Sequence, residues 1–400
     1  MSIVLNIGID FGATHTGVSI LASDQSKNFA VKRPTIIMQN VKSSTLAYIK
    51  PLSSEADVWK SLEHFKLGLM TFGDWAKKTK DDTLLSYARK LIETTNSVHQ
   101  PTVIVAVFLK QFWDELFGEY CARNVLAPRL LEGNVTFTYP AVWSSTAVDD
   151  FKQAVVDAGL FDKKWKLAFM KEHVAAARGI LSIKRFQWYH SRKRPVVVVD
   201  CGGMTTDGSI GYFNKKGASL SYEDFLHESC MTGSISVDAG IEKLLTEALE
   251  AMAQERSNMD FDEQRKLLLE ACRRQLKPPI NFLSLHNTAF EFKVAGESLG
   301  TETKNFRKVY QDLVDRIANL VQRLYNRVDS KIHHLLPNKV FLTGGLSKGE
   351  QLQTSLQQKL SERGLSLEVT LVGTGKERWT AVARGAAWNG KLDSRVVEEG

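Results

Sequence analysis

Cysteine is scarce in this 400-residue sequence. The four cysteines, Cys121, Cys201, Cys230 and Cys272, form no CxxC pair and have no histidine at metal-ligand spacing. Four thiols spread over this length are too few for a disulfide framework, so we expect them to be reduced and mostly buried. The pattern is typical of a reducing compartment, and the protein is predicted to be cytoplasmic.

Long hydrophobic runs are also absent. No apolar run approaches the roughly 20 residues that a membrane-spanning helix needs. The start of the chain, MSIVLNIGIDFG, lacks a basic region and has Asn6 and Asp10 within its apolar stretch, which argues against a secretory signal peptide. We therefore expect no membrane partner.

Neither sign of charge is in large excess. The sequence has 52 basic and 45 acidic residues and a formal net charge of +7. A nucleic-acid-binding patch and a solvated surface loop are both possible readings of one basic cluster, Lys184, Arg185, Arg192, Lys193 and Arg194. The near balance of charges favours the surface loop, so no nucleic-acid partner is predicted.

No linker rich in proline, glycine and serine divides the chain, although its length suits about two to four domains. An apolar strand followed by a glycine turn and a second strand begins near residue 3, and the same pattern begins again at residue 196. This repetition indicates an internal duplication. We therefore predict an α/β protein made of two interleaved lobes.

Other elements are expected between and after these repeats. The segment 83–98 has the apolar spacing of an amphipathic helix, whereas 61–69 looks helical or irregular and 101–131 looks strand-like at first and helical afterwards. A strand over 134–139 ends at a proline, and the helix behind it is expected to be capped by Ser144 or Ser145 and ended by Gly159.

Three apolar strands end in glycine turns: IGIDFGATHTG, VVVVDCGGMTTDG and VFLTGGLS. Such turns expose backbone N–H groups that bind phosphate oxygens, and an aspartate at a strand end, such as Asp10 or Asp200, can hold Mg²⁺ through water. Each turn taken singly is equally consistent with a tight β-hairpin. The three together favour a nucleotide triphosphate and its metal, and neither the P-loop nor the Rossmann fingerprint occurs.

These three segments, in this order, resemble the phosphate-1, phosphate-2 and adenosine loops of the actin-like ATPase superfamily. Within it the sequence is most similar to the heat shock protein 70 family, through YPAVWSSTAVDDFKQAVVDAGL, KEHVAAARGIL, EACRRQL and ARGAAWNG. PAVW, FKLGL and DCGG resemble the divergent short branch of that family, which lacks the peptide-binding domain. The resemblance therefore implies no peptide-clamping cycle.

The resemblance also implies roles for individual residues. Asp10 and Asp200 would hold Mg²⁺ through its water shell, and Glu172 would bind one of those waters. Asp207 would orient or deprotonate the attacking water, and Lys66 would neutralise the γ-phosphate. The residues implied to bind the nucleotide are Gly12, Ala13, Thr14, His15, Gly202, Gly203, Met204, Thr205, Gly233, Glu270, Arg273, Arg274, Gly344, Gly345 and Lys348.

The fold implied by the resemblance is the actin-like ATPase fold, in which two duplicated ribonuclease H-like domains flank a nucleotide cleft. Lobe I would span 1–185 and lobe II 186–400, with a helical subdomain inserted at about 225–300. The implied function is a monomeric switch that binds ATP or ADP with Mg²⁺, hydrolyses ATP slowly and acts on a protein partner that the sequence does not name.

Three other functions stay open on the sequence. A small-molecule kinase could use the same fold, and a filament protein could too. A scaffold that binds nucleotide without hydrolysing it is supported by Ala13 in place of a hydroxyl residue, Met204 in place of glycine and the altered context of Lys66. The retained acids count against it: Asp10, Glu172, Asp200 and Asp207.

Overall fold

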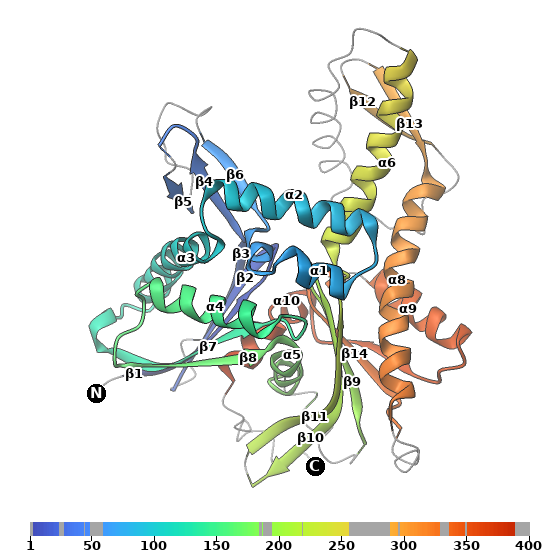
Figure 1. Cartoon of the computed structure of the whole chain (residues 1–400). Coiled ribbons are helices and arrows are strands. Elements are labelled where there is room, and N and C mark those ends of the chain that lie inside the picture. Colours follow the sequence, from blue (N-terminus) through green and yellow to red (C-terminus); the bar gives the residue numbers. More distant parts are fainter. Residues whose placement is uncertain are drawn as a thin grey trace.

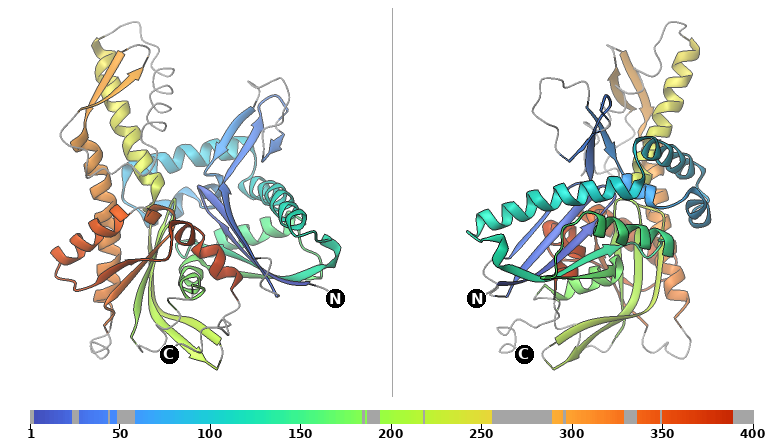
Figure 2. Two further views of the ribbon diagram at one scale, coloured as in Figure 1. Left: turned by 180° about the vertical axis from the view of Figure 1, so that it is seen from behind. Right: turned by 60° about the vertical axis from the view of Figure 1, so that its left-hand side comes forward.

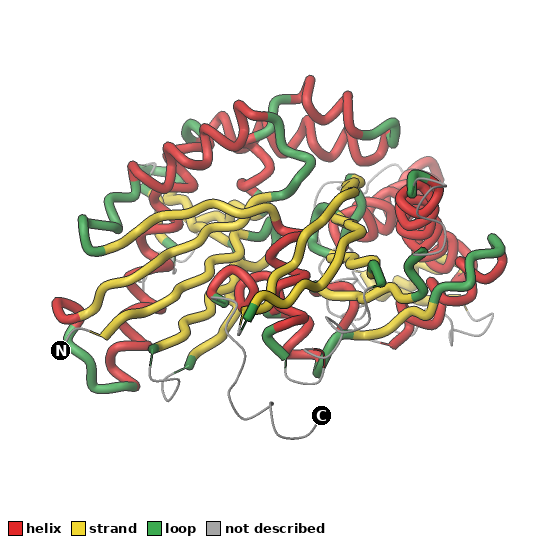
Figure 3. The backbone as a smooth tube through the Cα atoms, turned by 90° about the horizontal axis from the view of Figure 1, so that it is seen from below, coloured by secondary structure: helices red, strands yellow, loops and turns green. Residues whose placement is uncertain are grey.

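Two five-stranded sheets with the same strand order organise the molecule (Figure 1). The computed structural model describes residues 3–23, 28–43, 45–48, 59–183, 186, 194–217, 219–255, 289–294, 297–328, 336–348 and 350–388. Within these ranges the strands lie in the middle of the molecule and helices surround them (Figure 3).

The first sheet has the order β3-β2-β1-β7-β8. Its strands are β1 (Ile3–Phe11), β2 (His15–Ala22), β3 (Phe29–Pro34), β7 (Leu131–Tyr139) and β8 (Trp165–Lys171). The strands β1, β2 and β3 are antiparallel neighbours, whereas β7 runs parallel to both β1 and β8. The predicted hairpin at the start of the chain is therefore confirmed.

The second sheet repeats this arrangement with the order β11-β10-β9-β14-β15. Its strands are β9 (Val196–Cys201), β10 (Thr206–Lys216), β11 (Ser219–Cys230), β14 (Lys339–Thr343) and β15 (Glu368–Leu371). The pairs β9–β10 and β10–β11 are antiparallel, and β14 runs parallel to β9 and β15. The internal duplication that the sequence indicates is thus present in the strand topology.

Helices cover the first sheet and extend beyond it. They are α1 (Phe72–Lys78), α2 (Asp82–Val98), α3 (Pro101–Arg123), α4 (Ser145–Asp157) and α5 (Glu172–Leu181), with short 3₁₀ helices η2 (Phe65–Leu69) and η3 (Pro128–Leu130). A small sheet of order β5-β4-β6 is formed by β4 (Ile36–Asn40), β5 (Leu46–Ala47) and β6 (Trp59–Glu63). The helix behind β7 begins as predicted, because the side chain of Ser144 accepts a hydrogen bond from the Ala147 N–H.

The second sheet carries α6 (Ser234–Glu255), α8 (Thr303–Asn326), η6 (Gly345–Lys348), α9 (Glu350–Glu362), α10 (Gly375–Trp379) and α11 (Ala381–Ala387). A hairpin of β12 (Ala289–Val294) and β13 (Glu297–Glu302) lies between α6 and α8 in the chain. Seen from behind, the arm made by α6, α8 and this hairpin rises on one side of the molecule and the small β4–β6 sheet on the other, with α2 between them (Figure 2).

The four valines of β9 are buried on both faces of the second sheet. Val196 and Val198 pack in one hydrophobic cluster with residues of α5 and α11, whereas Val197 and Val199 pack in another with residues of α8 and α9. A strand with helices on both faces has no solvated side, and this explains why the run VVVV shows no alternation.

The helices α5 and α11 cross between the two sheets at glycines. A Cβ atom added to Gly385 would lie 1.7 Å from the Ala175 carbonyl oxygen, and one added to Gly179 would lie 2.1 Å from the Ala381 carbonyl oxygen. In the same way Gly8 of β1 faces the backbone of α11. Because α5 contacts β9–β11 and α11 contacts β1 and β2, this crossing joins the two sheets through backbone contact.

One expectation from the sequence is wrong and another is only partly confirmed. Residues 101–123 form a single helix with Pro101 in its first turn, so the strand expected at its start is absent. This helix buries apolar residues on most of its circumference, which removes the usual helical periodicity. The segment expected to be helical or irregular from Ser61 begins as the end of strand β6 and becomes a 3₁₀ helix only at Phe65.

Among the described residues, Cys121, Cys201 and Cys230 are free thiols, as the sequence predicts, and Cys272 lies outside the described ranges. None of the described helices is both long and apolar enough to span a bilayer. The basic cluster is also outside the described ranges, except for the exposed Arg194.

Candidate functional site

Four carboxylates meet between the two sheets. Asp10 lies near the end of β1, Glu172 is the first residue of α5, and Asp200 and Asp207 face each other across the β9–β10 hairpin. Their exposed fractions are 5% for Asp10 and Asp200, 7% for Glu172 and 0% for Asp207. The structure therefore brings together all four acids that the resemblance singled out.

Two buried lysines neutralise part of this charge. The Lys66 Nζ lies 3.0 Å from the Glu172 Oε1, and the rings of Phe11 and Trp143 flank the ammonium at 5.5 and 5.0 Å. This places Lys66, a predicted site residue, in the acidic centre. The second ammonium, that of Lys32, lies 2.5 Å from the Asp10 Oδ2 and was not predicted.

A single lysine in an edge strand does not by itself indicate a functional site. The residues around Lys32 in the sequence therefore did not identify it as a site residue. The indication lies on the neighbouring strand, where Gly17 is the register partner of Lys32. A Cβ atom added to Gly17 would lie 2.8 Å from the Lys32 side chain. The glycine of THTG therefore leaves the space through which the lysine side chain passes.

The hydrogen bonds of Asp207 and Asp200 fix both carboxylates. The Asp207 Oδ1 accepts hydrogen bonds from the Ser229 hydroxyl and, at 3.3 Å, from the Ala141 N–H, which belongs to the loop after β7 of the first sheet. Its Oδ2 is buried and has no hydrogen-bond partner in the described parts of the chain. The Asp200 Oδ1 accepts a hydrogen bond from the Thr343 hydroxyl at 2.9 Å. Asp207 thus keeps one oxygen available as an acceptor.

The acidic centre holds more negative charge than its lysines offset. Burial, together with the neighbouring Asp10 and Asp207, raises the pKa of Asp200 to about 7 against the opposing effect of Lys32. Burial also raises the pKa of Glu172 to about 8, although Lys66 acts in the opposite direction. Buried carboxylates that resist ionisation are stabilised by an added cation, so this set of oxygen donors fits a hydrated Mg²⁺ ion.

The first two glycine turns face each other across the site. A Cβ atom added to Gly203 would lie 2.5 Å from the Thr14 hydroxyl oxygen, so glycine is required for this close approach. The Gly203 carbonyl also accepts a hydrogen bond from the Ile235 N–H at 2.8 Å, and Gly233 packs against the Gly203 backbone. The second glycine turn is therefore held between the first turn and the start of α6.

The third glycine turn adjoins Asp200. Gly344 has a positive φ of 89°, and a Cβ atom there would lie 2.7 Å from the Asp200 Oδ1. Gly345 begins η6, and a Cβ atom added to it would lie 3.7 Å from the Trp379 ring. The structure thus places all three predicted turns around the same acidic centre.

His15 and Lys348 contact one aromatic side chain from opposite loops. The His15 ring meets Trp379 edge-on at 5.4 Å, and the Lys348 Nζ lies 3.5 Å from the centre of the same Trp379 ring. Burial, Lys32 and Lys348 lower the pKa of His15 to about 4, so the imidazole is neutral at physiological pH. Trp379 therefore connects the first and third turns, a role that sequence analysis missed.

Met204 packs away from the polar centre. Its side chain is 6% exposed and belongs to the hydrophobic cluster of the first domain, together with Met231 and Ile235 of the second. Met204, which stands where the chaperone pattern has glycine, therefore fills an apolar space between the domains.

The remaining predicted residues divide into two groups. Gly12, Ala13, Gly202 and Thr205 lie in the facing turns, where the Gly12 carbonyl accepts a hydrogen bond from the Thr35 hydroxyl at 2.7 Å. The expected adenosine-binding residues Glu270, Arg273 and Arg274 lie outside the described residues.

A separate cavity of about 370 Å³ lies between α2, α6 and α8. It is lined by polar and apolar side chains that include Asp81, Lys243 and Arg316, but by none of the predicted site residues that the structure describes. The Arg316 guanidinium and the Asp81 carboxylate lie 2.5 Å apart and join α8 to the start of α2. This ion pair connects α8, which packs on the second sheet, to a helix that precedes that sheet in the chain.

The duplicated sheets, with the three turns between them, define an α/β two-domain protein of the actin-like ATPase fold. The crystal structure of MreB5 of Spiroplasma citri bound to ADP is similar to this chain, with a TM-score of 0.56 and 13% sequence identity, and the match covers 96% of this chain and 94% of that chain. No family model matches the sequence, and no curated protein matches it. The comparisons therefore establish the fold.

Proposed function

We propose that the protein binds ATP with Mg²⁺ between its two domains and acts as a nucleotide-dependent switch. The observation that carries the proposal is the meeting of three glycine turns and four buried carboxylates at one place. The similar MreB5 structure, which is bound to ADP, supports a nucleotide as the ligand. The heat-shock-like motifs support ATP and a switch that a partner protein reads.

Asp10 and Asp200 are the residues that would hold Mg²⁺ through water, and Glu172 would accept a hydrogen bond from its water shell. When bound, the ion supplies positive charge beside the phosphate oxygens. The chain itself contributes backbone N–H groups from the two facing turns, which bind phosphate without an added side-chain charge. Lys66 stays beside Glu172 and adds a buried positive charge to the same centre.

Slow hydrolysis follows from the position of Asp207. Its free Oδ2 can accept a proton or a hydrogen bond from a water molecule, while the Ser229 hydroxyl and the Ala141 N–H hold the carboxylate in place. In phosphoryl transfer to water, orientation of the nucleophile and stabilisation of charge provide most of the catalysis. We therefore assign weak ATPase activity to this site.

Domain movement would transmit the state of the nucleotide. We propose lobe I as 1–185 and lobe II as 186–400, with the helical insertion near 225–300, in a monomeric cytoplasmic protein. The Ala141–Asp207 hydrogen bond reaches from the first sheet to the second, so a change at the phosphate site alters a contact between the domains.

A second candidate function is nucleotide binding without turnover. The Lys32 ammonium already neutralises Asp10, a residue that the hydrolytic proposal assigns to the metal shell. An ion held by one free aspartate instead of two would bind more weakly and would position the phosphates less firmly.

Two measurements on the purified chain test these proposals. ATP with Mg²⁺ should raise the melting temperature of the wild type and leave that of Asp200→Asn unchanged. Release of phosphate should fall about 100-fold or more in Asp207→Asn while ATP binding is retained, because loss of a general base costs roughly that much.

The results of these two measurements distinguish the two candidate functions. A melting temperature that does not respond to ATP and Mg²⁺ would contradict the binding proposal. Binding by the wild type without any phosphate release would select the non-hydrolysing switch.

A further inference from the structure

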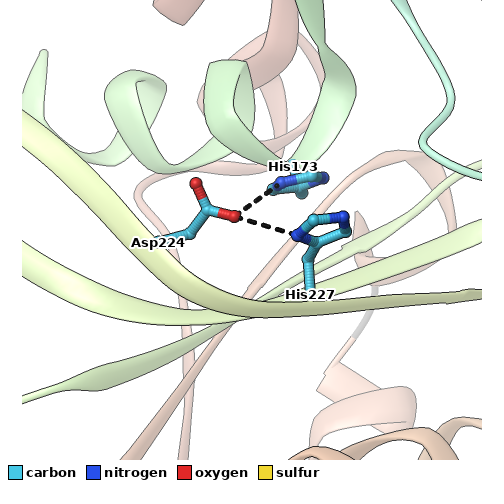
Figure 4. Close-up of side chains that lie close together, drawn as sticks. All are labelled: His173, Asp224 and His227. Atoms are coloured by element: carbon cyan, nitrogen blue, oxygen red, sulfur yellow. Dashed lines mark hydrogen bonds and ion pairs between the residues drawn. The ribbon is translucent and has the colours of Figure 1, made fainter.

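A cluster of two histidines and one aspartate lies where the first turn of α5 packs on β11. His173 follows Glu172 in the first turn of α5, and Asp224 and His227 lie on β11. The imidazoles of both histidines face the Asp224 carboxylate, as Figure 4 shows. This cluster plays no part in the proposed nucleotide function.

The distances within the cluster match those between ligands of a single metal ion. The Asp224 Oδ2 lies 3.3 Å from the His173 Nε2 and 3.1 Å from the His227 Nδ1, and one ligand atom from each residue lies within 4.8 Å of the others. Ligands bound tetrahedrally at about 2.0–2.1 Å from Zn²⁺ are separated by roughly 3.3 Å. These separations are therefore compatible with three ligands of one ion, provided that the Asp224 oxygen, to which both imidazole nitrogens now point, shifts to admit the ion.

The three side chains differ in how far they are exposed to solvent. The His173 side chain is 1% exposed, that of Asp224 is 23% exposed and that of His227 is 40% exposed. The His173 Nδ1 is buried and has no hydrogen-bond partner among the described residues, and it would carry the imidazole proton once the Nε2 bound an ion. The open side at His227 gives an ion a path to the site.

We propose that His173, Asp224 and His227 bind one divalent transition-metal ion, with Zn²⁺ as the best match. Two imidazole nitrogens and one carboxylate oxygen form a mixed donor set that favours such ions over Mg²⁺ or Ca²⁺. Three protein ligands leave a coordination position for water on the exposed side. The ion would join the first turn of α5 to β11 and so fix the segment that carries Glu172.

Lys171 provides a contact that opposes the metal. Its Nζ lies 3.2 Å from the His227 Nε2 and donates a hydrogen bond to it in the metal-free protein. Binding of the ion at Nδ1 moves the imidazole proton to Nε2, and the ammonium must then turn away. Removing this cation should therefore strengthen metal binding, an effect opposite to that of removing a ligand.

Cobalt absorption tests the proposal with a readout that does not depend on nucleotide. The chain is treated with chelator, dialysed and titrated with Co²⁺ in the presence of excess Mg²⁺, which occupies the oxygen-rich acidic centre. The wild type should bind one Co²⁺ with visible d–d bands, and Zn²⁺ should abolish these bands. His227→Ala and Asp224→Asn should lose the bands and weaken binding by about tenfold or more, and Lys171→Met should tighten binding about fivefold.

His99→Ala is the matched control, because it removes an exposed imidazole from the end of α2. It should leave the bands unchanged, and circular dichroism should show that the partly exposed variants His227→Ala and Asp224→Asn remain folded. The proposal is overturned if the wild type shows no saturable band, or if the band persists in His227→Ala. Because ATP is absent throughout, neither result depends on the nucleotide site.

Discussion

The Lys32 ammonium occupies the immediate surroundings of Asp10, 2.5 Å from its Oδ2, at the end of the strand where Mg²⁺ is expected to be held. Both side chains are less than a tenth exposed. Lys32 thus places a positive charge beside Asp10, one of the two carboxylates proposed to hold Mg²⁺ through water. Lys32 and a bound metal ion compete for the same negative charge.

Replacing Lys32 should lower the stability of the ligand-free protein and increase its stabilisation by ligand. Lys32→Met leaves a buried carboxylate without its partner, so the free energy of unfolding of the ligand-free protein should fall by about 3–5 kcal/mol. Stabilisation by Mg²⁺ and ATP should become larger, since the competing ammonium is gone. Urea unfolding with and without ligand measures both effects, and Lys60→Met, on the exposed surface of β6, is the control. A smaller ligand effect in Lys32→Met would show that the lysine supports the ligand instead.

Asp200→Asn should stabilise the ligand-free protein at alkaline pH. The folded-state pKa of Asp200 is about 7, above its ordinary value near 4, so the folded protein binds more protons than the unfolded chain between these values. The contribution of Asp200 to the free energy of unfolding is therefore present at low pH and is lost as the pH rises through about 7.

The amide of Asn can still accept the Thr343 hydrogen bond and carries no charge to bury. Urea unfolding at pH 5.5 and pH 8 should show a smaller loss of stability in Asp200→Asn than in the wild type. An equal loss in both proteins would mean that another group causes the pH dependence.

Any side chain larger than hydrogen at the glycines where α5 and α11 cross should destabilise the protein. In Gly385→Ala the new methyl group would lie 1.7 Å from the Ala175 carbonyl oxygen, and the helices would have to separate. We expect a loss of roughly 3 kcal/mol or more in the free energy of unfolding. Gly118→Ala in α3 is the matched control, since a Cβ atom there meets nothing within 4 Å and should stabilise by about 0.5–1 kcal/mol. Similar effects of the two substitutions would contradict the close contact.

Arg316→Gln should loosen the arrangement of α8 relative to α2. The Asp81–Arg316 pair is partly exposed, so its loss should cost only about 0.2–1 kcal/mol of global stability. The distance between fluorophores placed on α2 and α8 should nevertheless increase in solution. Arg316 is the better choice for substitution because Asp81 also caps α2. Lys110→Gln, which removes an ion pair within α3, should leave the distance unchanged.

Residues that act at strand ends were predictable from the sequence. Asp10 and Asp200 lie at the ends of strands whose apolar runs are clear in the sequence, whereas Asp207 was placed by resemblance. Lys66 and Glu172 were placed by resemblance alone, and the structure brings them within 3.0 Å of each other. The adenosine-binding residues remain a prediction.

Other parts of the site depend on contacts that a linear pattern does not encode. Lys32 reaches Asp10 across the edge of a sheet, and Trp379 joins His15 to Lys348 from a helix far along the chain. The helix over 101–123 was misjudged because a helix buried on most sides lacks the period that identifies one. The histidines of the proposed metal site lie 54 positions apart and meet only when α5 packs on β11.

The contact of Gly179 and Gly385 with opposing backbone has a consequence for how the domains could rotate. Peptide groups meet there without intervening side chains, so a small rotation of one sheet against the other would require no change of rotamer at the crossing. Resistance to such a rotation would come from other contacts between the two halves of the chain, among them Asp81–Arg316 and Ala141–Asp207. Substitutions at these edges would then change the rate of domain motion with little effect on the core.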